Sequence, residues 1–268
     1  MREVDGSGAL LPDQALAQHY AEIIQVAAYL EAEWSDFLLG KDVLRQDDQK
    51  FAPVSPTFYV EVAQKIVAWV AAAGLQVRHA CDVGGATGRL VYELARNIDR
   101  IDSVTLVEPA PALAHWARRL LLDGEPIDDF PVVHTRRRTG VGAPARVPTR
   151  PANVRIRVVE QGVDDLDREL KFDLVCCLNV IDRVARPASL VQTLASHICP
   201  GGILVLASPL SFDQRFTPDR ADWVDDLEAL LPPARWRIVG RADVLYELRR
   251  HERERISYLS QVVAAVLR

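Results

Sequence analysis

Short apolar runs alternate with segments of helical periodicity along most of this 268-residue chain. Five runs have the length and composition of buried strands: 77–83, 104–107, 154–159, 174–178 and 203–207. Helical patterns lie between them at 88–97, 111–122 and 188–197, with a weaker turn at 164–170. Strands and helices that alternate in this way predict an α/β fold, in which right-handed crossovers connect a parallel sheet.

Two further strand-like runs, 236–239 and 256–267, end the chain on either side of the polar stretch 247–255. Consecutive strands without an intervening helix predict an antiparallel hairpin. We therefore expect this hairpin to close an otherwise parallel sheet.

The chain before the first strand is expected to divide into two parts. Residues 1–56 are expected to form an N-terminal cap, with a helix over 13–39 and a proline-broken linker. Residues 57–268 are expected to form the main domain, which opens with a helix over 57–73. Trp34 and Phe37 lie on the apolar stripe of the first helix, where either core packing or a homodimer contact would explain them.

The most informative segment is the glycine turn between the first strand and the following helix. Gly84, Gly85 and Gly88 form a small-residue turn, and Glu108 ends the next strand twenty residues after Gly88. A glycine turn lets backbone N–H groups approach a ligand closely, and an acidic residue at that place can hold two ribose hydroxyls. The pair predicts a site for a nucleoside cofactor.

The spacing of the turn indicates which cofactor is bound. An NAD site prefers three glycines in the order G-x-G-x-x-G, whereas here the turn is Gly84-Gly85-Ala86-Thr87-Gly88, preceded by Asp82. This arrangement resembles motif I of the class I S-adenosylmethionine-dependent methyltransferases. The resemblance implies that Asp82 and the backbone of the turn receive the methionine part of the cofactor.

Three more segments are similar to that family. Glu108 stands at the place of its ribose-binding acid, 160–164 follows the third strand where adenine is contacted, and 172–206 matches its fourth strand, helix and proline-glycine-glycine turn. Val163 departs from the pattern, because many members carry an aspartate there. Asp164 or the backbone alone could replace it. NAD binding, or a module that no longer uses a cofactor, remain the alternatives.

The resemblance implies a Rossmann-like, seven-stranded, mostly parallel sheet with an antiparallel last strand and an N-terminal helical cap. It also implies S-adenosyl-L-methionine as cofactor and S-adenosyl-L-homocysteine as product. The cofactor-binding residues implied are Asp82, Gly84, Gly85, Ala86, Gly88, Arg89, Glu108, Pro109, Gln161, Gly162, Val163 and Asn179.

A narrower resemblance concerns the acceptor. The segments 178–184, 207–218 and 243–253 are similar to elements of the 4-mercaptohistidine N-methyltransferases of ovothiol biosynthesis, and the first is also similar to one in protein-histidine N-methyltransferases. This implies methylation of an imidazole nitrogen in a small molecule or a peptide. The match departs at 223–226, and the first eighty residues are largely unmatched. A natural-product or peptide-modifying methyltransferase with an oxygen or carboxylate acceptor is therefore the alternative.

Candidate acceptor residues follow from the same segments. Asn179 and Asp182 end the fourth strand, at the sheet edge where α/β proteins bind ligands, and are expected to orient the acceptor. Arg183 is expected either beside the acceptor or in a local ion pair with Asp182. Three C-terminal residues are candidates for the roof of the pocket: Tyr246, His251 and Tyr258. Tyr59 and His134 are weaker candidates, and no catalytic base is assigned.

Composition limits the remaining possibilities. An apolar content of 49% and a mean hydropathy near zero are typical of a soluble globular protein, and a net charge of -5 does not favour nucleic-acid binding. Four cysteines without metal-ligand spacing indicate reduced core residues and no metal site. The absence of a long apolar segment or a secretion pattern predicts a cytoplasmic protein without membrane attachment.

One region interrupts the alternation. Residues 123–152 contain five prolines and a group of arginines that includes 136–138. Thirty residues without regular structure are uncommon within a compact domain unless they serve a function, so we expect a partly ordered flap near the cofactor rather than a passive insertion. The arginines form either a solvated loop or a clamp for an anionic substrate.

Overall fold

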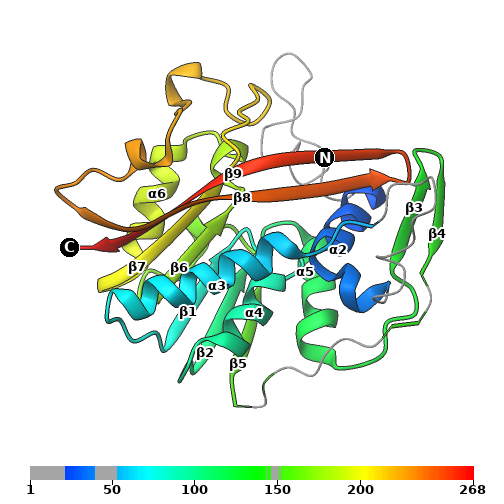
Figure 1. Ribbon diagram of the computed structural model, residues 1–268, viewed down its shortest axis with the longest axis horizontal. Helices are drawn as coiled ribbons and strands as arrows, with labels where there is room; N and C mark the ends of the chain where they lie inside the picture. The colour runs from blue at the N-terminus through cyan, green and yellow to red at the C-terminus, as the bar shows by residue number, and fades with distance from the viewer. Residues whose placement is uncertain (1–21, 40–52, 143, 146–150, 152) are drawn as a thin grey trace.

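The computed structural model describes residues 22–39, 53–142, 144–145, 151 and 153–268 and contains a seven-stranded sheet (Figure 1). The strand order is β5-β2-β1-β6-β7-β9-β8. Strands β5, β2, β1, β6 and β7 pair in parallel, whereas β9 runs antiparallel to both of its neighbours. The bounds are β1 His79–Val83, β2 Ser103–Val107, β5 Arg155–Val159, β6 Phe172–Leu178, β7 Ile198–Ser208, β8 Trp236–His251 and β9 Glu254–Leu267. The predicted fold class is confirmed.

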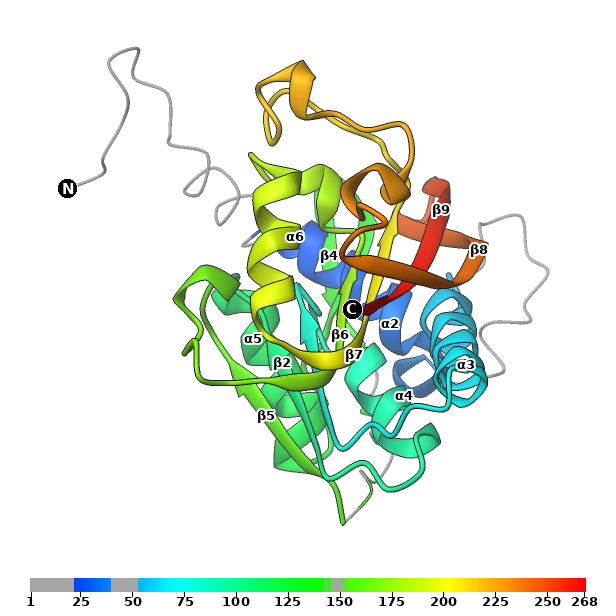
Figure 2. The same cartoon turned by 90° about the vertical axis from the view of Figure 1, so that its left-hand side faces the viewer.

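Helices cover both faces of the sheet. Figure 2 shows α6 on one side of the strands and α3 and α4 on the other. The helices are α2 Ile23–Leu38, α3 Thr57–Ala72, α4 Arg89–Asn97, α5 Pro111–Arg118 and α6 Pro187–Ser196. The pattern at 111–122 divides into α5 and a π-helical turn over Arg119–Asp123. The described part of the expected 13–39 helix is α2, and residues 13–21 and 40–52 lie outside the described residues.

Adjacent residues of the central strands enter two separate cores, as the alternation of a strand requires. Cys176 packs in the core that contains α2, α3 and α4, and Cys177 packs in the core that contains α6. All four cysteines are free thiols; Cys81 is also buried, whereas Cys199 is half-buried. No helix in the described part of the chain has the length and apolar content to span a bilayer.

Helix α2 is built into the first of these cores. Its Trp34 is fully buried, lies 5.5 Å from the ring of Tyr92 in an edge-to-face arrangement, and donates from Nε1 to Thr87 Oγ1 at 3.1 Å. Intramolecular packing therefore accounts for Trp34. Phe37 is half-buried beside it.

The segment 123–152, expected to be a partly ordered flap, contains a hairpin that the sequence did not predict. The strands β3 (Pro131–Thr135) and β4 (Arg138–Val141) form an antiparallel hairpin, and Ile127 and Ala145 form a bridge beyond it. The sidechain of Phe130 is buried against α2 and supplies the apolar anchor that the proline-rich composition obscured. Exposed Arg136, Arg137 and Arg138 lie at the hairpin turn, and none of the described residues of 123–152 lines the cavity described below.

The C-terminal hairpin is confirmed, but the predicted break at 247–255 is wrong. β8 and β9 continue as paired strands to a tight turn at Glu252 and Arg253. Charged residues are accommodated because cross-strand partners neutralise them, as in the ion pair between Arg255 and Glu247 at 3.5 Å. The hairpin extends past the sheet and reaches α2 and the β3–β4 hairpin (Figure 1).

Candidate cofactor and acceptor site

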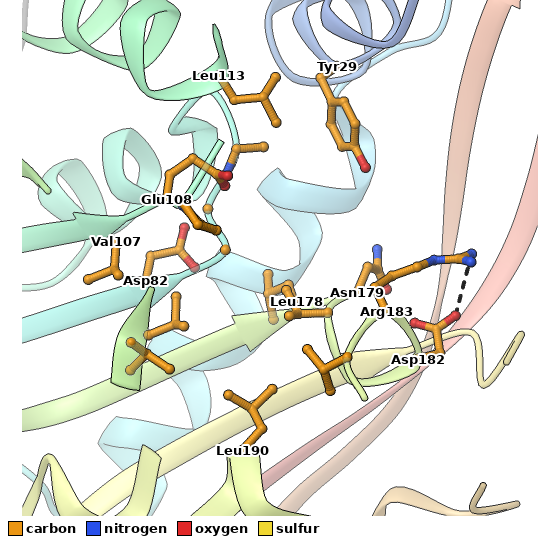
Figure 3. Close-up of a pocket in the computed structure, with 18 of the residues that line it drawn as sticks. Tyr29, Asp82, Val107, Glu108, Leu113, Leu178, Asn179, Asp182, Arg183 and Leu190 are labelled. Carbon is orange, nitrogen blue, oxygen red and sulfur yellow. Dashed lines mark hydrogen bonds and ion pairs between the residues drawn. The ribbon is translucent and has the colours of Figure 1, made fainter. Parts of the chain in front are cut away.

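A cavity of about 250 Å³ opens at the carboxyl ends of β1, β2 and β6 (Figure 3). Glu108 and Asp82 lie on one side of it, and the group formed by Asn179, Asp182 and Arg183 lies on the other. Most residues singled out from the sequence line this cavity. They are Asp82, Gly84, Gly85, Ala86, Glu108, Pro109, Gly162, Val163, Asn179, Asp182, Arg183, Tyr246 and Tyr258.

Tyr59 lines it too, whereas five of the residues singled out do not. His134 lies in β3, where its Nδ1 is 2.8 Å from Glu252 Oε1. Gly88 forms the left-handed N-cap of α4, with φ of 93°, and Arg89 is directed away into an ion-pair cluster with α2. Gln161 lies in the loop after β5, half-buried. His251 ends β8, where its Nε2 lies 3.0 Å from Glu254 Oε2.

The glycine turn is packed so closely against neighbouring side chains that a Cβ atom at its first two glycines would collide with them. A Cβ at Gly84, whose φ is +70°, would lie 2.5 Å from Val180 Cγ2. A Cβ at Gly85 would lie 2.4 Å from Asp82 Oδ2. Ala86 adopts φ of 46°, a conformation that L-residues rarely take. The glycines therefore let the backbone of the turn pass close to Asp82 and Val180 at the cavity wall, where a side chain would not fit.

The acid at the end of β2 is held by two backbone amides. Glu108 Oε2 accepts from Ala86 N at 3.0 Å, and Oε1 accepts from Ala110 N at 2.8 Å. Burial raises the pKa of Glu108 to about 7, although both amides lower it. The carboxylate thus has a fixed position at the cavity wall, which suits an acceptor of hydrogen bonds from ribose hydroxyls.

Three buried carboxyl groups gather at this end of the cavity. Asp82 and Glu108 line it, and Glu33 of α2 lies behind the turn. Burial raises the pKa of Asp82 well above its usual value and that of Glu33 to about 7, and the other two carboxylates raise the pKa of Asp82 further. Such a cluster suits a ligand that carries positive charge.

The other end of the cavity is formed by the residues after β6. Asn179 adopts φ of 57°, and its Oδ1 accepts from Ser260 Oγ at 2.9 Å. Asp182 is fully buried, and among the described residues neither carboxylate oxygen accepts a hydrogen bond of normal geometry. The hydroxyl of Ser208 and the backbone N–H of Ser211 nevertheless face the carboxylate and lower its pKa. Its nearest cation is Arg183, at 3.5 Å, whose guanidinium stacks over Phe216. Burial raises the pKa of Asp182, and Arg183 is the main group that opposes this.

Tyrosine rings form the walls between the two ends. Tyr59 and Tyr246 meet edge-to-face at 6.3 Å, and Tyr246 stacks near Tyr258 at 6.3 Å. Tyr29 of α2 points its ring into the cavity from above (Figure 3). Four residues that line the cavity were not predicted from the sequence: Tyr29, Leu113, Leu190 and Leu248. Glu33, behind the turn, was not predicted either. Tyr29 and Glu33 lie off the apolar stripe of their helix, so the pattern gave no signal for them.

The chemistry available at the site is therefore that of carboxylates, amides, phenols and one guanidinium. Among the residues that the structure describes, no group of three or more histidine, cysteine, aspartate or glutamate side chains could hold a metal ion.

Comparison with known proteins gives a family match and a set of solved structures with a similar fold. Residues 58–260 match the family model described as a methyltransferase domain. A search of the curated proteins found no match. At the identities given below, likeness to solved structures establishes the fold alone.

Three solved structures show the extent of that likeness. Magnesium protoporphyrin IX methyltransferase from Synechocystis PCC 6803, with bound SAM, is 17% identical with a TM-score of 0.54 and covers 96% of this chain and 98% of its own. The N-methyltransferase NodS from Bradyrhizobium japonicum WM9, in complex with S-adenosyl-L-homocysteine, is 16% identical with a TM-score of 0.50 and covers 90% and 98%. An S-adenosylmethionine-dependent methyltransferase from Clostridium acetobutylicum ATCC 824 is 13% identical with a TM-score of 0.51 and covers 78% and 92%.

The family match spans most of the chain, and it includes the glycine turn, Glu108 and the residues after β6. The chain belongs to the methyltransferase-domain family and is an S-adenosylmethionine-dependent methyltransferase.

Proposed function

We propose that the protein transfers the methyl group of S-adenosyl-L-methionine to a ring nitrogen of an imidazole, in a histidine-derived small molecule or in a histidine of a peptide. Asp182 is the observation that supports this most directly. It lines the cavity, is fully buried and, among the described residues, accepts no hydrogen bond of normal geometry. A buried carboxylate that accepts no well-formed hydrogen bond lowers the stability of the protein, and a ligand that donates a hydrogen bond to it removes part of this cost. An imidazole N–H is such a donor.

The cofactor roles are assigned from the geometry together with the family resemblance. The backbone of 84–86 and Asp82 are assigned to the methionine part, Glu108 to the ribose hydroxyls, and Gly162 and Val163 to the adenine. All of these residues line the cavity, which supports the assignment, and Asp82 and Glu108 lie on the same side of it (Figure 3).

The cofactor supplies an electrophilic methyl group on a sulfonium, which departs as a thioether when the methyl group has been transferred. Asp182 accepts the hydrogen bond from one ring N–H, which fixes the tautomer and leaves the lone pair of the other nitrogen free to attack. The new N–C bond places positive charge on the ring, and the carboxylate stabilises that charge as it develops. Because burial raises its pKa, Asp182 is also suited to take up the N–H proton afterwards.

Asn179 and the tyrosines orient the acceptor ring. The Oδ1 atom of Asn179 accepts a hydrogen bond from Ser260, which directs the side-chain NH2 of Asn179 to donate to the ring that receives the methyl group. Tyr59, Tyr246 and Tyr258 present flat aromatic walls, which bind a planar ring and stabilise positive charge.

An oxygen acceptor is the alternative. A hydroxyl could donate to Asp182 in the same way, whereas a carboxylate acceptor would meet the negative charge of Asp182 at close range. Incubation with S-adenosyl-L-methionine and a panel of histidine, 4-mercaptohistidine, histidine-containing peptides and phenols separates these possibilities. A gain of one methyl group on the imidazole compounds, detected by mass spectrometry, supports the proposal, whereas methylation of the phenols alone overturns it.

The Asp182→Asn variant tests the role of the carboxylate. We expect kcat to fall by about a hundredfold, because an amide neither stabilises the developing charge nor takes up a proton, while the cofactor Kd changes less than threefold. Asp213→Asn is the matched control, because Asp213 is paired with Arg215 on the loop after β7. Unchanged kcat in Asp182→Asn would show that Asp182 has no part in the reaction.

A further inference from the structure

Glu33 caps a helix that is not its own. The N-cap of α4 is Gly88, which has no side chain to satisfy the first amides of the helix. Glu33, on α2, supplies the missing acceptor: Oε2 accepts from Arg89 N at 3.0 Å and Oε1 from Thr87 N at 3.4 Å. The side chain is fully buried. A carboxylate at a helix N-terminus is favourable, so α2 and the glycine turn hold each other in place.

The neighbouring Arg89 lowers the pKa of Glu33 but forms its side-chain ion pairs with other carboxylates. The guanidinium of Arg89 forms two hydrogen bonds with Asp36, at 2.7 and 2.9 Å, and one with Glu93 at 2.8 Å. Three carboxylates of this cluster, on Glu33, Asp36 and Glu93, therefore share one cation. When all are ionised, the cluster keeps a net charge of -2, which acts on the adjacent cavity.

Two more carboxylates and one phenol face Glu33, and the carboxylates add to this negative field. Asp82 from β1 and Glu108 from the end of β2 both repel it, and the hydroxyl of Tyr59, from α3, donates to its Oε1 at 3.4 Å. Burial raises the pKa of Glu33 to about 7, and that of Glu108 to about 7. Near neutral pH, the buried carboxyl groups therefore retain protons that a cation in the cavity would displace.

We propose that Glu33 is a specificity-determining residue of the cofactor site, whose buried charge, added to those of Asp82 and Glu108, favours the positively charged donor over its thioether product. The hydrogen bonds that Glu33 accepts from the turn support both ligands equally, because both share the adenosyl and amino-acid parts. Its charge also acts on the amino-acid part of both ligands, so only the sulfonium, which the thioether lacks, makes the two differ. This inference rests on S-adenosyl-L-methionine being the donor, but not on the identity of the acceptor.

The Glu33→Gln variant removes the charge and keeps one of the two acceptor oxygens. The hydrogen bond that is lost affects both ligands alike, so a difference between the two ligands reports the charge. We expect calorimetry at pH 7.5 to show a Kd for S-adenosyl-L-methionine about tenfold higher, and a Kd for S-adenosyl-L-homocysteine raised less than threefold. Glu31→Gln is the matched control on the same helix, because Glu31 pairs with Arg249 rather than with the turn. An equal loss for both ligands in Glu33→Gln, or the same differential loss in Glu31→Gln, overturns the proposal.

Proton release provides a test on the wild-type protein that needs no variant. Titration at pH 6.5 in two buffers of different ionisation enthalpy should show protons released when S-adenosyl-L-methionine binds, and fewer when S-adenosyl-L-homocysteine binds. Equal proton release by the two ligands contradicts the proposal. If the wild type binds neither ligand, the donor assignment fails and this inference fails with it. If both bind but no imidazole is methylated, only the acceptor proposal fails.

Discussion

Residues in unusual backbone conformations gather at the cavity. Gly84, Ala86 and Asn179 all have positive φ and all line it. Such conformations cost free energy in residues other than glycine and persist where surrounding contacts hold them. Asn179 is held on both sides, because its backbone N–H donates to Ala207 O at 2.7 Å and its side chain accepts from Ser260. The site is therefore fixed before a ligand arrives.

Gly85 is expected to be essential for steric reasons alone. In Gly85→Ala the new Cβ would lie 2.4 Å from Asp82 Oδ2 and displace it, so we expect the cofactor Kd to rise at least tenfold, measured by calorimetry. Gly74→Ala is the control, because Gly74 has a φ of +67° but open space around it, far from the site. It should lose about 1 kcal/mol of stability with an unchanged Kd. Equal Kd values for both variants would contradict the steric argument.

Ser260 is expected to act through Asn179. It is fully buried, does not line the cavity, and donates to Asn179 Oδ1. Ser260→Ala frees the amide to rotate, so we expect kcat to fall about tenfold while the Kd for the cofactor stays within twofold. Ser257→Ala, on the same strand, removes only a hydrogen bond to Glu247 at the surface and should leave both values unchanged. A parallel loss of thermal stability and kcat in both variants would indicate a general effect on the strand.

At the scale of elements, α2 connects parts of the chain that are distant in sequence. Asp36 binds Arg89 at the start of α4, and Glu31 binds Arg249 in β8 through two hydrogen bonds of 2.6 and 2.5 Å. The same Glu31 accepts from the backbone of Val54. One helix thus positions the glycine turn and the C-terminal hairpin, which lie on opposite sides of the cavity.

The Glu31–Arg249 pair is expected to contribute substantially to the folded state. Both side chains are largely buried, at 13% and 8% exposure. Glu31→Ala should lower the free energy of unfolding by about 3 kcal/mol, because it removes the carboxylate from a largely buried cation. Adding Arg249→Ala should cost less than the sum of the two single changes, by at least 1 kcal/mol in denaturant titrations. If the free-energy changes of the two single variants add up to that of the double variant, the interaction between Glu31 and Arg249 contributes nothing to stability.

The same elements show what the sequence could and could not predict. The strands β1 and β2 and the glycine turn were predictable, because local alternation and residue size determine them. The contribution of α2 to the site was not, because Glu33 and Tyr29 reach the turn and the cavity through contacts over fifty residues away, such as Glu33 with Arg89. The β3–β4 hairpin was missed because it packs against α2, which is distant in the sequence.

At the scale of the whole molecule, the burial of three carboxyl groups stores electrostatic free energy in the ligand-free protein. Asp82, Glu33 and Glu108 are all buried and repel one another. Hydrogen bonds from the turn and from Ala110 offset this only in part, since the pKa values remain raised. The ligand-free protein is therefore less stable than it would be without these buried carboxyl groups, and the same groups favour a positively charged ligand.

Stability should accordingly fall as pH rises, contrary to the usual behaviour of paired carboxylates. The folded pKa of Glu33 and of Glu108 is about 7, above the ordinary value of 4.5, so the folded state binds more protons than the unfolded state between these values. Their contribution is complete below pH 4.5 and is lost as pH rises through 7. We expect the free energy of unfolding without ligand to drop by on the order of 2–4 kcal/mol between pH 5.5 and 8.0 in denaturant titrations.

A Glu33→Gln, Glu108→Gln double variant should show a smaller drop, because neither side chain titrates. Saturating S-adenosyl-L-methionine should reduce the drop in the wild type. An equal pH dependence in the wild type and the double variant would mean that these carboxyl groups are already ionised in the folded protein.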